Sequence, residues 1–303
     1  MRILLTGANG QVGTELRRSL APLGELIPAT RTGALPDGAA CEQADFNRPD
    51  TLAALVARLR PDVVVNAAAY TAVDRAESEP DLAFRINAEA VDALTRACAT
   101  TGARLVHYST DYVFSGENGR PWREDDPTAP LNTYGASKLA GEEAIRDSGC
   151  EHMIFRIAWV YAAHGHNFLR TMLRLAAERD VLQVVDDQHG TPTPAHWVAG
   201  ATARVLATGH DGSGTWHLAP QGHTTWRGFA ERIFRLARQA GLLERVPELA
   251  AVSSSGFPAP ARRPCWSVLD SNRAREELGI KLPGWEEGVA AVLAETTPSG
   301  KEA

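Results

Sequence analysis

The sequence predicts an α/β protein: a doubly wound parallel sheet followed by a smaller C-terminal substrate-binding lobe. In the first half of the chain, short apolar runs alternate with helical patterns, which is typical of a parallel sheet covered by helices on both faces. A glycine-rich turn follows the first apolar run, and polar or small residues follow the later ones. Such sheets bind ligands beyond the carboxyl ends of their strands, so these residues are the first candidates for a site.

The strands are expected where apolar runs of strand length occur, at Arg2–Thr6, Leu26–Thr30, Val63–Asn66, Leu105–Tyr108 and His152–Ile157. Helical patterns lie near 11–20, 50–59, 80–101 and 134–148. Beyond residue 156 prolines punctuate the chain, with helices expected near 226–240 and 271–278. We therefore predict a nucleotide-binding domain over 1–155, to which the chain returns later, and a lobe mainly within 156–303. We expect the tail Thr297–Ala303 to be frayed.

Composition narrows the class of protein. The chain has 303 residues, 44% of them hydrophobic and 22% charged, with a net charge of −6 and no basic run. Nucleic-acid binding is therefore not expected. We expect no signal peptide, and no apolar stretch approaches the roughly 20 residues that a membrane span needs, so a membrane partner is not expected. The cysteines are far apart and lack metal spacing, so we expect reduced thiols in a cytoplasmic protein: Cys41, Cys98, Cys150 and Cys265.

The glycine-rich turn reads Gly7-Ala8-Asn9-Gly10-Gln11-Val12-Gly13 and lies between the first strand and the first helix, as the Rossmann dinucleotide fingerprint requires. Gly7 permits the tight turn, Gly10 lets the backbone approach a pyrophosphate, and Gly13 lets the helix pack closely. The helix N-terminus supplies amides and a partial positive charge. The spacing Gly-x-x-Gly-x-x-Gly is typical of short-chain dehydrogenase/reductase-like proteins.

Tyr134 and Lys138 are four residues apart in a predicted helix, so their side chains share one face. We expect the lysine to lower the pKa of the phenol, which could then give a proton to a carbonyl that receives a hydride. The polar cluster Ser109-Thr110-Asp111 directly follows an apolar run and is expected near that phenol.

Taken together, the motifs are similar to those of the dTDP-4-dehydrorhamnose reductase family of extended short-chain dehydrogenase/reductases. The likeness covers nearly the whole chain and rests on Gly7–Gly13, Asn66–Asp74, His107–Phe114, Tyr134–Lys138, Phe155–Tyr161, Asp187–Thr193 and Arg263-Pro264. It implies an NAD(P)H-dependent oxidoreductase of carbohydrate biosynthesis. The implied reaction is reduction of the 4-keto group of the nucleotide sugar dTDP-4-dehydro-L-rhamnose to dTDP-L-rhamnose, the last step of dTDP-rhamnose biosynthesis.

The resemblance also implies roles for the catalytic residues. Tyr134 would donate the proton to the C4 oxygen, and Lys138 would hold the nicotinamide ribose hydroxyls. Thr110 would hydrogen-bond the reacting oxygen or Tyr134, and Asp111 would accept hydrogen bonds from sugar hydroxyls. Trp159 would form an aromatic wall for the deoxysugar or the base.

Further substrate contacts are implied for Gln188 and Arg263, with Asn167 as another candidate for the diphosphate or sugar. The forked guanidinium donors of arginine suit a diphosphate. Arg262 is adjacent to Arg263, and the sequence does not decide between the two.

NADPH, with NADH as the second choice, is the expected cofactor. The chain has Arg31 rather than an acidic residue after the second strand, and an arginine there can pair with the 2′-phosphate of NADPH. The complete expected cofactor set is Gly7, Gly10, Gln11, Val12, Gly13, Arg31, Asp45, Phe46, Ala69, Tyr70, Thr71, Tyr108, Tyr134 and Lys138.

Alternatives stay open at this point. A nucleotide-sugar 4-epimerase or 4,6-dehydratase uses the same tyrosine and lysine, although a dehydratase would place an acid–base pair after Thr110, where this chain has a single carboxylate. A non-catalytic regulatory subunit of the same fold is the second rival. No metal site is expected, because His164, His166 and His189 lack ligand spacing. A homodimer is compatible with the resemblance, but the sequence leaves the oligomeric state open.

Overall fold

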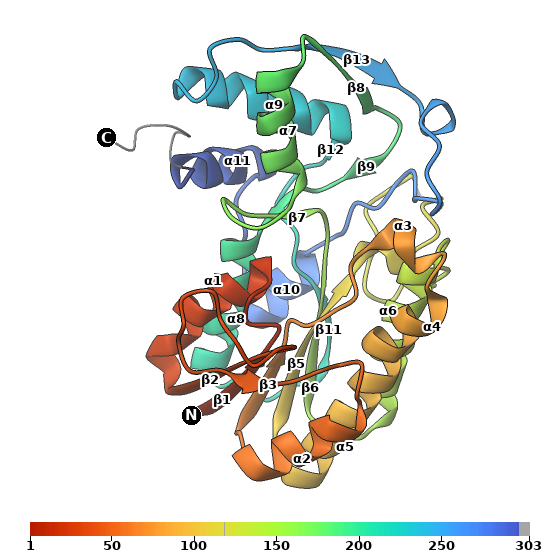
Figure 1. The fold of residues 1–303 in the computed structure, drawn as a ribbon. Helices are drawn as coiled ribbons and strands as arrows, with labels where there is room; N and C mark the ends of the chain where they lie inside the picture. The colour runs from red at the N-terminus through yellow and green to blue at the C-terminus, as the bar shows by residue number, and fades with distance from the viewer. Residues whose placement is uncertain (118, 297–303) are drawn as a thin grey trace.

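The computed structural model describes residues 1–117 and 119–296, and a seven-stranded, wholly parallel sheet forms the centre of its larger part (Figure 1). The strand order is β11-β6-β5-β4-β1-β2-β3. The strands are β1 (Arg2–Thr6), β2 (Glu25–Thr30), β3 (Glu42–Gln43), β4 (Val63–Asn66), β5 (Arg104–Thr110), β6 (His152–Ile157) and β11 (Gly214–His217). The prediction of a doubly wound parallel sheet is confirmed.

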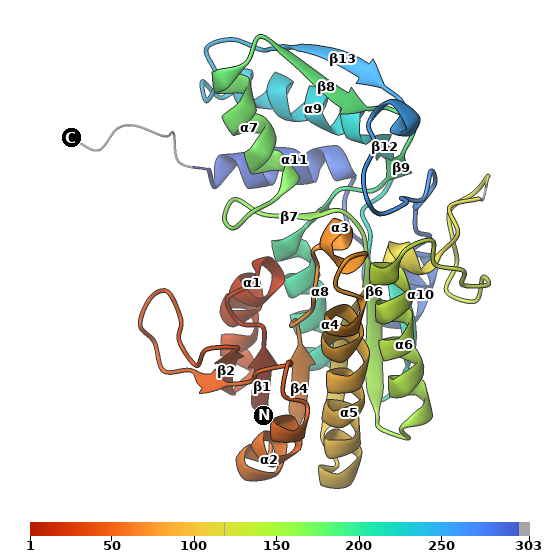
Figure 2. The same cartoon turned by 45° about the vertical axis from the view of Figure 1, so that its right-hand side comes forward.

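Helices cover both faces of this sheet (Figure 2). On one face lie α1 (Gln11–Leu20) and α8 (Ala195–Thr208), and on the other α2 (Asp50–Leu59), α5 (Ala90–Thr101) and α6 (Thr133–Asp147). Successive side chains of a strand point to opposite faces, so Ile3 packs in the core cluster of the first face and Leu4 in that of the second. Both side chains are fully buried. The sheet is thus packed against a hydrophobic core on both faces.

The smaller lobe has its own hydrophobic core, beyond the carboxyl ends of the strands (Figure 1). Aromatic and aliphatic residues of α7 (Phe168–Glu178), α9 (Trp226–Gln239) and α11 (Trp285–Ala294) fill it. The parallel pair β8 (Val181–Val185) and β13 (Glu248–Val252) covers one side. Two short ladders join the connecting segments: β7 (Val160–Tyr161) with β10 (Thr193–Pro194), and β9 (His189–Gly190) with β12 (Thr224–Thr225).

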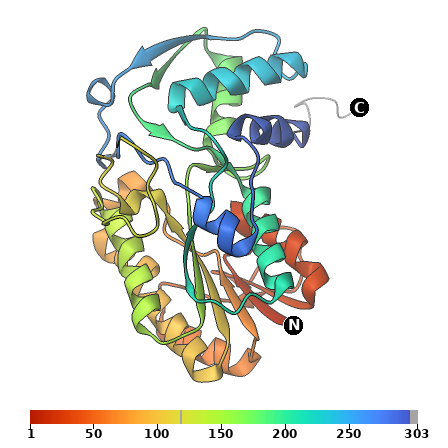
Figure 3. The same cartoon turned by 180° about the vertical axis from the view of Figure 1, so that it is seen from behind.

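The chain passes between the two parts several times. After the first visit to the lobe it returns to add α8 and β11 to the larger part, and α10 (Asn272–Leu278) follows after a second visit (Figure 3). Because α8 packs on α1 and β11 extends the sheet beside β6, residues from beyond position 190 belong to the core of the larger part. The remaining short elements are η1 (Ala21–Leu23), α3 (Val73–Ala76), η3 (Asp111–Val113) and η4 (Ser254–Gly256).

The helix expected near 80–101 is present as one uninterrupted helical segment, and it contains a π-helical turn that the sequence did not predict. The segment consists of α4 (Pro80–Phe84), the π-helical η2 (Arg85–Glu89) and α5. Asn87 lies in this π-helical turn, and its side chain accepts a hydrogen bond from the Tyr70 amide at 2.8 Å and donates to the Tyr70 carbonyl and the Ser137 hydroxyl, each at 3.0 Å. The π-helical turn is wider than an α-helical turn, and its Asn87 side-chain amide contacts the loop that follows β4. The tail Thr297–Ala303, expected to be frayed, lies outside the described residues.

Two negative findings apply to the described residues only. No helix there combines the length and the apolar character needed to cross a bilayer. Within residues 1–117 and 119–296, no three histidine, cysteine, aspartate or glutamate side chains are grouped so that they could hold a metal ion.

Candidate active site

The turn after β1 has the backbone that a dinucleotide site needs. Gly7 has φ +68°, and a Cβ there would lie 2.5 Å from the carbonyl carbon of Ala67. A Cβ on Gly13 would lie 2.0 Å from the Gly7 carbonyl oxygen, so Gly13 lets the first turn of α1 close against the loop itself. Gly10 has extended backbone, precedes α1 and has no side-chain cap. The free amides at this N-terminus suit a pyrophosphate.

Tyr134 and Lys138 lie one turn apart on α6, as predicted. The helix begins at Thr133, and the Asn132 side chain caps it by accepting a hydrogen bond from the Gly135 amide at 2.8 Å. Lys138 is only 2% exposed, and its ammonium nitrogen lies 2.7 Å from the Tyr108 carbonyl oxygen and 3.0 Å from Nε2 of His107. Burial lowers the pKa of Lys138 to about 8.

The expected lowering of the Tyr134 pKa by Lys138 is wrong for the protein alone. Burial raises the pKa of Tyr134 to about 12, an effect that the Thr110 side chain partly offsets. The physical reason is direction: the Lys138 nitrogen points toward β5, where His107 and the Tyr108 carbonyl hold it. Tyr134 itself is half-buried and packs edge-on against Tyr112, with 6.0 Å between ring centroids.

Thr110 and Asp111 end β5 beside the phenol and are almost completely buried. The Thr110 hydroxyl donates to Oδ1 of Asp111 at 3.0 Å and accepts from the Tyr112 amide at 3.2 Å. Oδ2 of Asp111 has no hydrogen-bond partner among the described residues. Burial raises the pKa of this carboxyl to about 7, although the Ser267 and Thr110 side chains act in the opposite direction. A buried carboxylate oxygen without a partner is costly, so its position favours a ligand that donates a hydrogen bond.

Trp159 follows β6 with φ +46° and stacks on Trp226, with 3.6 Å between ring centroids and 6° between ring planes. A Cβ on Gly190 would lie 2.3 Å from the Trp159 ring, so glycine is required there. The buried Gln188 accepts a hydrogen bond from the Trp226 indole at 3.1 Å and donates to the Ser254 hydroxyl at 2.8 Å. Trp159 and Gln188 are therefore parts of one assembly that Trp226 completes.

Arg263 forms a two-bond ion pair with Asp74 of α3, at 2.9 and 2.7 Å, which lowers the pKa of that carboxyl. Arg262 is exposed, and its carbonyl accepts a hydrogen bond from Asn132 at 2.8 Å. Both arginines line a cavity of about 1090 Å³ between the lobe and the segment 254–265, together with Gln188 and Trp226. The charge of Arg263 is already paired there, whereas Arg262 has no ion-pair partner within the described part of the chain.

The expected adenosine contacts lie after β2 and β3. Arg31 is exposed, and its guanidinium has no ion-pair partner among the residues that the structure describes. Asp45 accepts hydrogen bonds from the amide and the side chain of Asn47, at 3.0 and 3.1 Å. Phe46 is 5% exposed and packs in the core beneath α2, so little of its ring is available to a ligand.

The remaining expected cofactor residues differ in what they offer. The Tyr108 hydroxyl lies 2.7 Å from the Thr202 hydroxyl of α8, so only the Tyr108 backbone is directed at Lys138. Tyr70 donates a hydrogen bond to Glu79 at 2.6 Å. Gln11 accepts one from Asn167 at 2.9 Å, which joins the glycine-rich turn to the lobe. Thr71 is exposed, whereas Ala69 and Val12 are half-buried.

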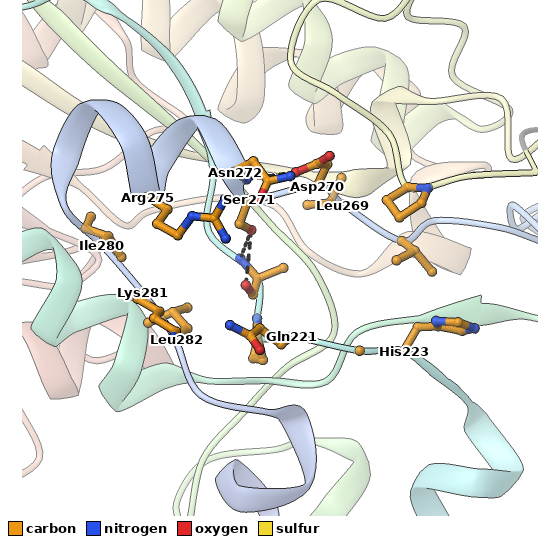
Figure 4. A pocket seen from close by; sticks show the side chains of 15 residues that line it. Gln221, His223, Leu269, Asp270, Ser271, Asn272, Arg275, Ile280, Lys281 and Leu282 are labelled. Carbon is orange, nitrogen blue, oxygen red and sulfur yellow. Dashed lines mark hydrogen bonds between the residues drawn. The ribbon is translucent and has the colours of Figure 1, made fainter.

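A second cavity, of about 350 Å³, lies between α10 and the segment 219–223 (Figure 4). Its most prominent polar contact joins Ser271 to the Ala219 backbone, at 3.0 Å to the amide and 3.1 Å to the carbonyl. Arg275 and Lys281 are at its rim, both exposed. None of the predicted catalytic or binding residues is among those that line it, so it is separate from the site around Tyr134.

Sequence reasoning missed several residues of the site. The sequence pattern assigns no role to His107, and it does not identify Trp226 and Asp74 as partners of the predicted site residues. A hydrophobic strand with a histidine at its centre is the one signal that pointed to His107, because a fully buried histidine needs partners for both ring nitrogens.

Comparison with known proteins gives one consistent family. The model of the RmlD substrate binding domain matches residues 1–297. The dTDP-4-dehydrorhamnose reductase of Salmonella typhimurium strain LT2 is 49% identical over 298 residues, which is 97% of this chain and 98% of the relative. The crystal structure of the dTDP-4-dehydrorhamnose reductase from Bacillus anthracis in complex with NADP is 35% identical, with a TM-score of 0.87 over 97% of this chain and 99% of that one.

A more distant structure shares the fold alone. The UDP-glucose 4-epimerase of Thermus thermophilus, in complex with NAD, is 22% identical, with a TM-score of 0.81 over 99% of this chain and 100% of that one. The fold therefore does not distinguish a reductase from an epimerase, and the function has to be argued from the site.

Proposed function

This chain belongs to the dTDP-4-dehydrorhamnose reductase family, and we propose that the site around Tyr134 is where it acts. It is an NADPH-dependent oxidoreductase that reduces the 4-keto group of dTDP-4-dehydro-L-rhamnose to give dTDP-L-rhamnose, the last step of dTDP-rhamnose biosynthesis. The observation that supports this site best is the convergence of the Tyr134 phenol, the Thr110 hydroxyl and the unpartnered Asp111 oxygen at the end of β5.

The proposed cofactor-binding site is the loop from Gly7 to Gly13 together with the N-terminus of α1, which has no side-chain cap. The loop fits a pyrophosphate, because Gly7 and Gly13 have no room for a Cβ and Gly10 leaves the amides open. Lys138 would hold the nicotinamide ribose, and Arg31 would pair with the 2′-phosphate. When bound, NADPH supplies the hydride for the keto carbon.

The protein's own residues supply the proton and the orientation. Tyr134 donates its phenolic proton to the C4 oxygen, and Thr110 shares a hydrogen bond with the phenol or with that oxygen. Oδ2 of Asp111 accepts a hydrogen bond from a sugar hydroxyl, which satisfies an atom that lacks a partner in the described protein. Together the three side chains fix the keto group before the reaction begins.

The nucleotide part of the substrate is assigned to the cavity of about 1090 Å³ in the lobe. Trp159 and Trp226 form an aromatic surface beside it, and Gln188 is held by hydrogen bonds to the Trp226 indole and Ser254. Arginine side chains at the rim supply positive charge for a diphosphate. These are the expected substrate residues with the partners that the fold gives them.

We also propose how the chain divides. Residues 1–155, with α8, β11 and α10, would form the cofactor domain, and the rest of 156–303 the substrate lobe. The free thiols of Cys41, Cys98, Cys150 and Cys265 support a cytoplasmic location, where thiols stay reduced.

The decisive experiment is a coupled synthesis from dTDP-glucose, with NMR of the sugar product. Formation of dTDP-rhamnose with stoichiometric oxidation of NADPH supports the proposal. An epimerase would leave added NADPH unconsumed, because its cofactor completes a full redox cycle. A regulatory subunit would bind NADPH but would not oxidise it with any dTDP-4-ketosugar, and either outcome would overturn the assignment.

A further inference from the structure

A row of four buried polar side chains leads from the first strand to the catalytic lysine. Thr6, Asn66 and His107 are register partners on the adjacent strands β1, β4 and β5. The Thr6 hydroxyl donates to Oδ1 of Asn66 at 2.7 Å, Nδ2 of Asn66 lies 3.0 Å from Nδ1 of His107, and Nε2 of His107 lies 3.0 Å from the Lys138 nitrogen. No member is more than 2% exposed.

The orientation of the Asn66 amide is fixed by the backbone. Oδ1 of Asn66 accepts a hydrogen bond from the Ala68 amide at 3.1 Å, and a backbone N–H cannot act as an acceptor. If the amide were turned round, its NH2 group would face that N–H. The NH2 group of Asn66 therefore faces His107, and Nδ1 of His107 must accept.

It follows that His107 carries its ring proton on Nε2. Burial and the neighbouring Lys138 cation keep the pKa of His107 well below its ordinary value, so the ring is neutral and has one proton. With Nδ1 accepting, that proton is on Nε2 and points at the Lys138 nitrogen, 3.0 Å away. An ammonium group has donors only, whereas a free amine has a lone pair to accept this hydrogen bond.

We propose that His107 is a positioning residue that favours the uncharged amine of Lys138 and so sets the pH above which this lysine loses its charge. The proposal deepens the proposed function and rests on it. The Lys138 nitrogen is held against β5 by His107 and the Tyr108 carbonyl, and the Nε2–H of His107 can be accepted by the amine but not by the ammonium. Turnover that depends on the charge of Lys138, the residue that would hold the nicotinamide ribose, should therefore fall at an alkaline pH that His107 determines.

The other groups that face Lys138 act in the opposite sense or are neutral. Glu142, one turn further along α6, raises the pKa of Lys138, although its own charge is shared with Arg156 of β6 at 2.7 Å. Tyr134 lies one turn before, and the Tyr108 carbonyl accepts from the Lys138 nitrogen in either protonation state. Burial lowers the pKa of Lys138 to about 8, so the hydrogen bond from His107 acts on a lysine whose charge is already lost at mildly alkaline pH.

The first test reads the tautomer directly and needs no activity. Long-range ¹H–¹⁵N spectra of protein labelled with [¹⁵N]histidine are recorded with and without NADP⁺, and the His107 signals are assigned by their loss in His107→Gln. We expect a neutral ring protonated at Nε2. A ring protonated at Nδ1, or at both nitrogens, would overturn the proposal. Because this result does not depend on turnover, an inactive protein would count against the proposed function but not against the tautomer.

The second test is the pH dependence of kcat. In His107→Gln the side-chain oxygen can turn toward Lys138 and accept from the ammonium, so the alkaline fall in kcat should move up by about one pH unit, a tenfold change in proton affinity. Asn66→Asp should move it in the same direction, because a carboxylate draws the ring proton to Nδ1. KM for NADPH should stay unchanged in His107→Gln.

The matched control is Thr202→Val, which removes a buried hydroxyl partner of Tyr108 on the other face of β5 without touching Lys138. In Thr202→Val, kcat should fall at the same alkaline pH as in the wild type. If His107 had only a structural role, kcat would be lower at every pH and the pH of its alkaline fall would not change. That result, or a shift of the alkaline fall to lower pH, would overturn the proposal.

Discussion

The indole of Trp159 lies flat on that of Trp226, with 3.6 Å between ring centroids and 6° between ring planes. Trp159 follows β6 of the central sheet, and Trp226 begins α9 of the lobe. The stack therefore ties the lobe to the carboxyl edge of the sheet. It also places the Trp226 indole N–H where it holds Gln188, on the wall of the large cavity.

Replacing Trp226 by alanine should weaken substrate binding and leave cofactor binding intact. The variant loses the ring stack and leaves Oε1 of Gln188 without its donor. An aromatic pair contributes about 0.5–1.5 kcal/mol beyond the area it buries, so KM for the nucleotide sugar should rise about tenfold. Trp226→Phe retains a ring but not the N–H and should lie between wild type and alanine. If KM for the sugar did not change in Trp226→Ala, the cavity would not be the nucleotide site.

Tyr134→Phe should lower kcat by about 10²- to 10⁴-fold, the usual contribution of a positioned proton donor. The phenyl ring keeps the edge-on contact with Tyr112, so folding should be preserved. Tight-binding measurements with NADPH should give the wild-type Kd, because Lys138 and the glycine-rich loop are untouched. Wild-type turnover in this variant would remove Tyr134 from the reaction.

The parts of this site that the sequence predicted well are local. Gly7 and Gly13 sit in a strand–turn–helix unit whose backbone follows from a few successive residues, and Tyr134 and Lys138 share a face through helix periodicity alone. The raised pKa of Tyr134 could not be predicted in that way. It results from burial of the phenol, and Lys138 does not counter it because contacts with β5 direct the Lys138 nitrogen elsewhere.

The helix α8 was not predicted from the sequence, because its pattern is weak and its packing partner is distant along the chain. The segment that forms α8 is so uniformly apolar that it shows little contrast between a buried and an exposed face, and it lies directly after Pro194. Its partner α1 is close to the other end of the sequence, and their contact forms only when the chain returns from the lobe. The Trp159–Trp226 stack likewise joins segments that no local pattern connects.

Asp111→Asn should become more stable relative to the wild type as the pH rises. Burial raises the pKa of Asp111 to about 7 in the folded protein, above an unfolded value of about 3.9. A carboxyl with a raised folded pKa contributes stability that is fully present below the unfolded pKa and is lost as the pH rises through the folded pKa. That contribution therefore declines between about pH 4 and pH 7, by up to about 4 kcal/mol.

The measurement is urea unfolding of both proteins at pH 5 and pH 8, in which other titrating groups cancel in the difference. Asparagine cannot ionise, so the free energy of unfolding of Asp111→Asn relative to wild type should be larger at pH 8 than at pH 5. A difference that did not depend on pH would show that the Asp111 pKa is not raised in the folded protein.

Arg31→Ala should reduce the preference for NADPH. The exposed guanidinium at the end of β2 has no ion-pair partner among the described residues, so it is free to pair with a 2′-phosphate. A hydrogen bond to a charged group contributes about 1.5–3 kcal/mol, so kcat/KM for NADPH should fall about 10- to 100-fold while that for NADH stays constant. Arg238→Ala, an exposed arginine on α9 of the lobe, is the control for loss of one positive charge. Equal kcat/KM values for both cofactors in wild type and Arg31→Ala would refute the prediction.

Arg263 could bind the diphosphate of the substrate, or it could only form the ion pair that holds Asp74. A double-mutant cycle gives different results for these two roles. If Arg263 contacts the diphosphate, Arg263→Ala should raise the Ki of dTDP as a competitive inhibitor about tenfold, whereas Asp74→Ala frees the guanidinium and should leave Ki unchanged or lower it. If the pair only fastens the segment 261–263 to α3, both single variants and the double variant should weaken dTDP equally. Arg262→Ala decides between neighbours, because an effect on Ki larger than that of Arg263→Ala would transfer the diphosphate contact to the exposed arginine.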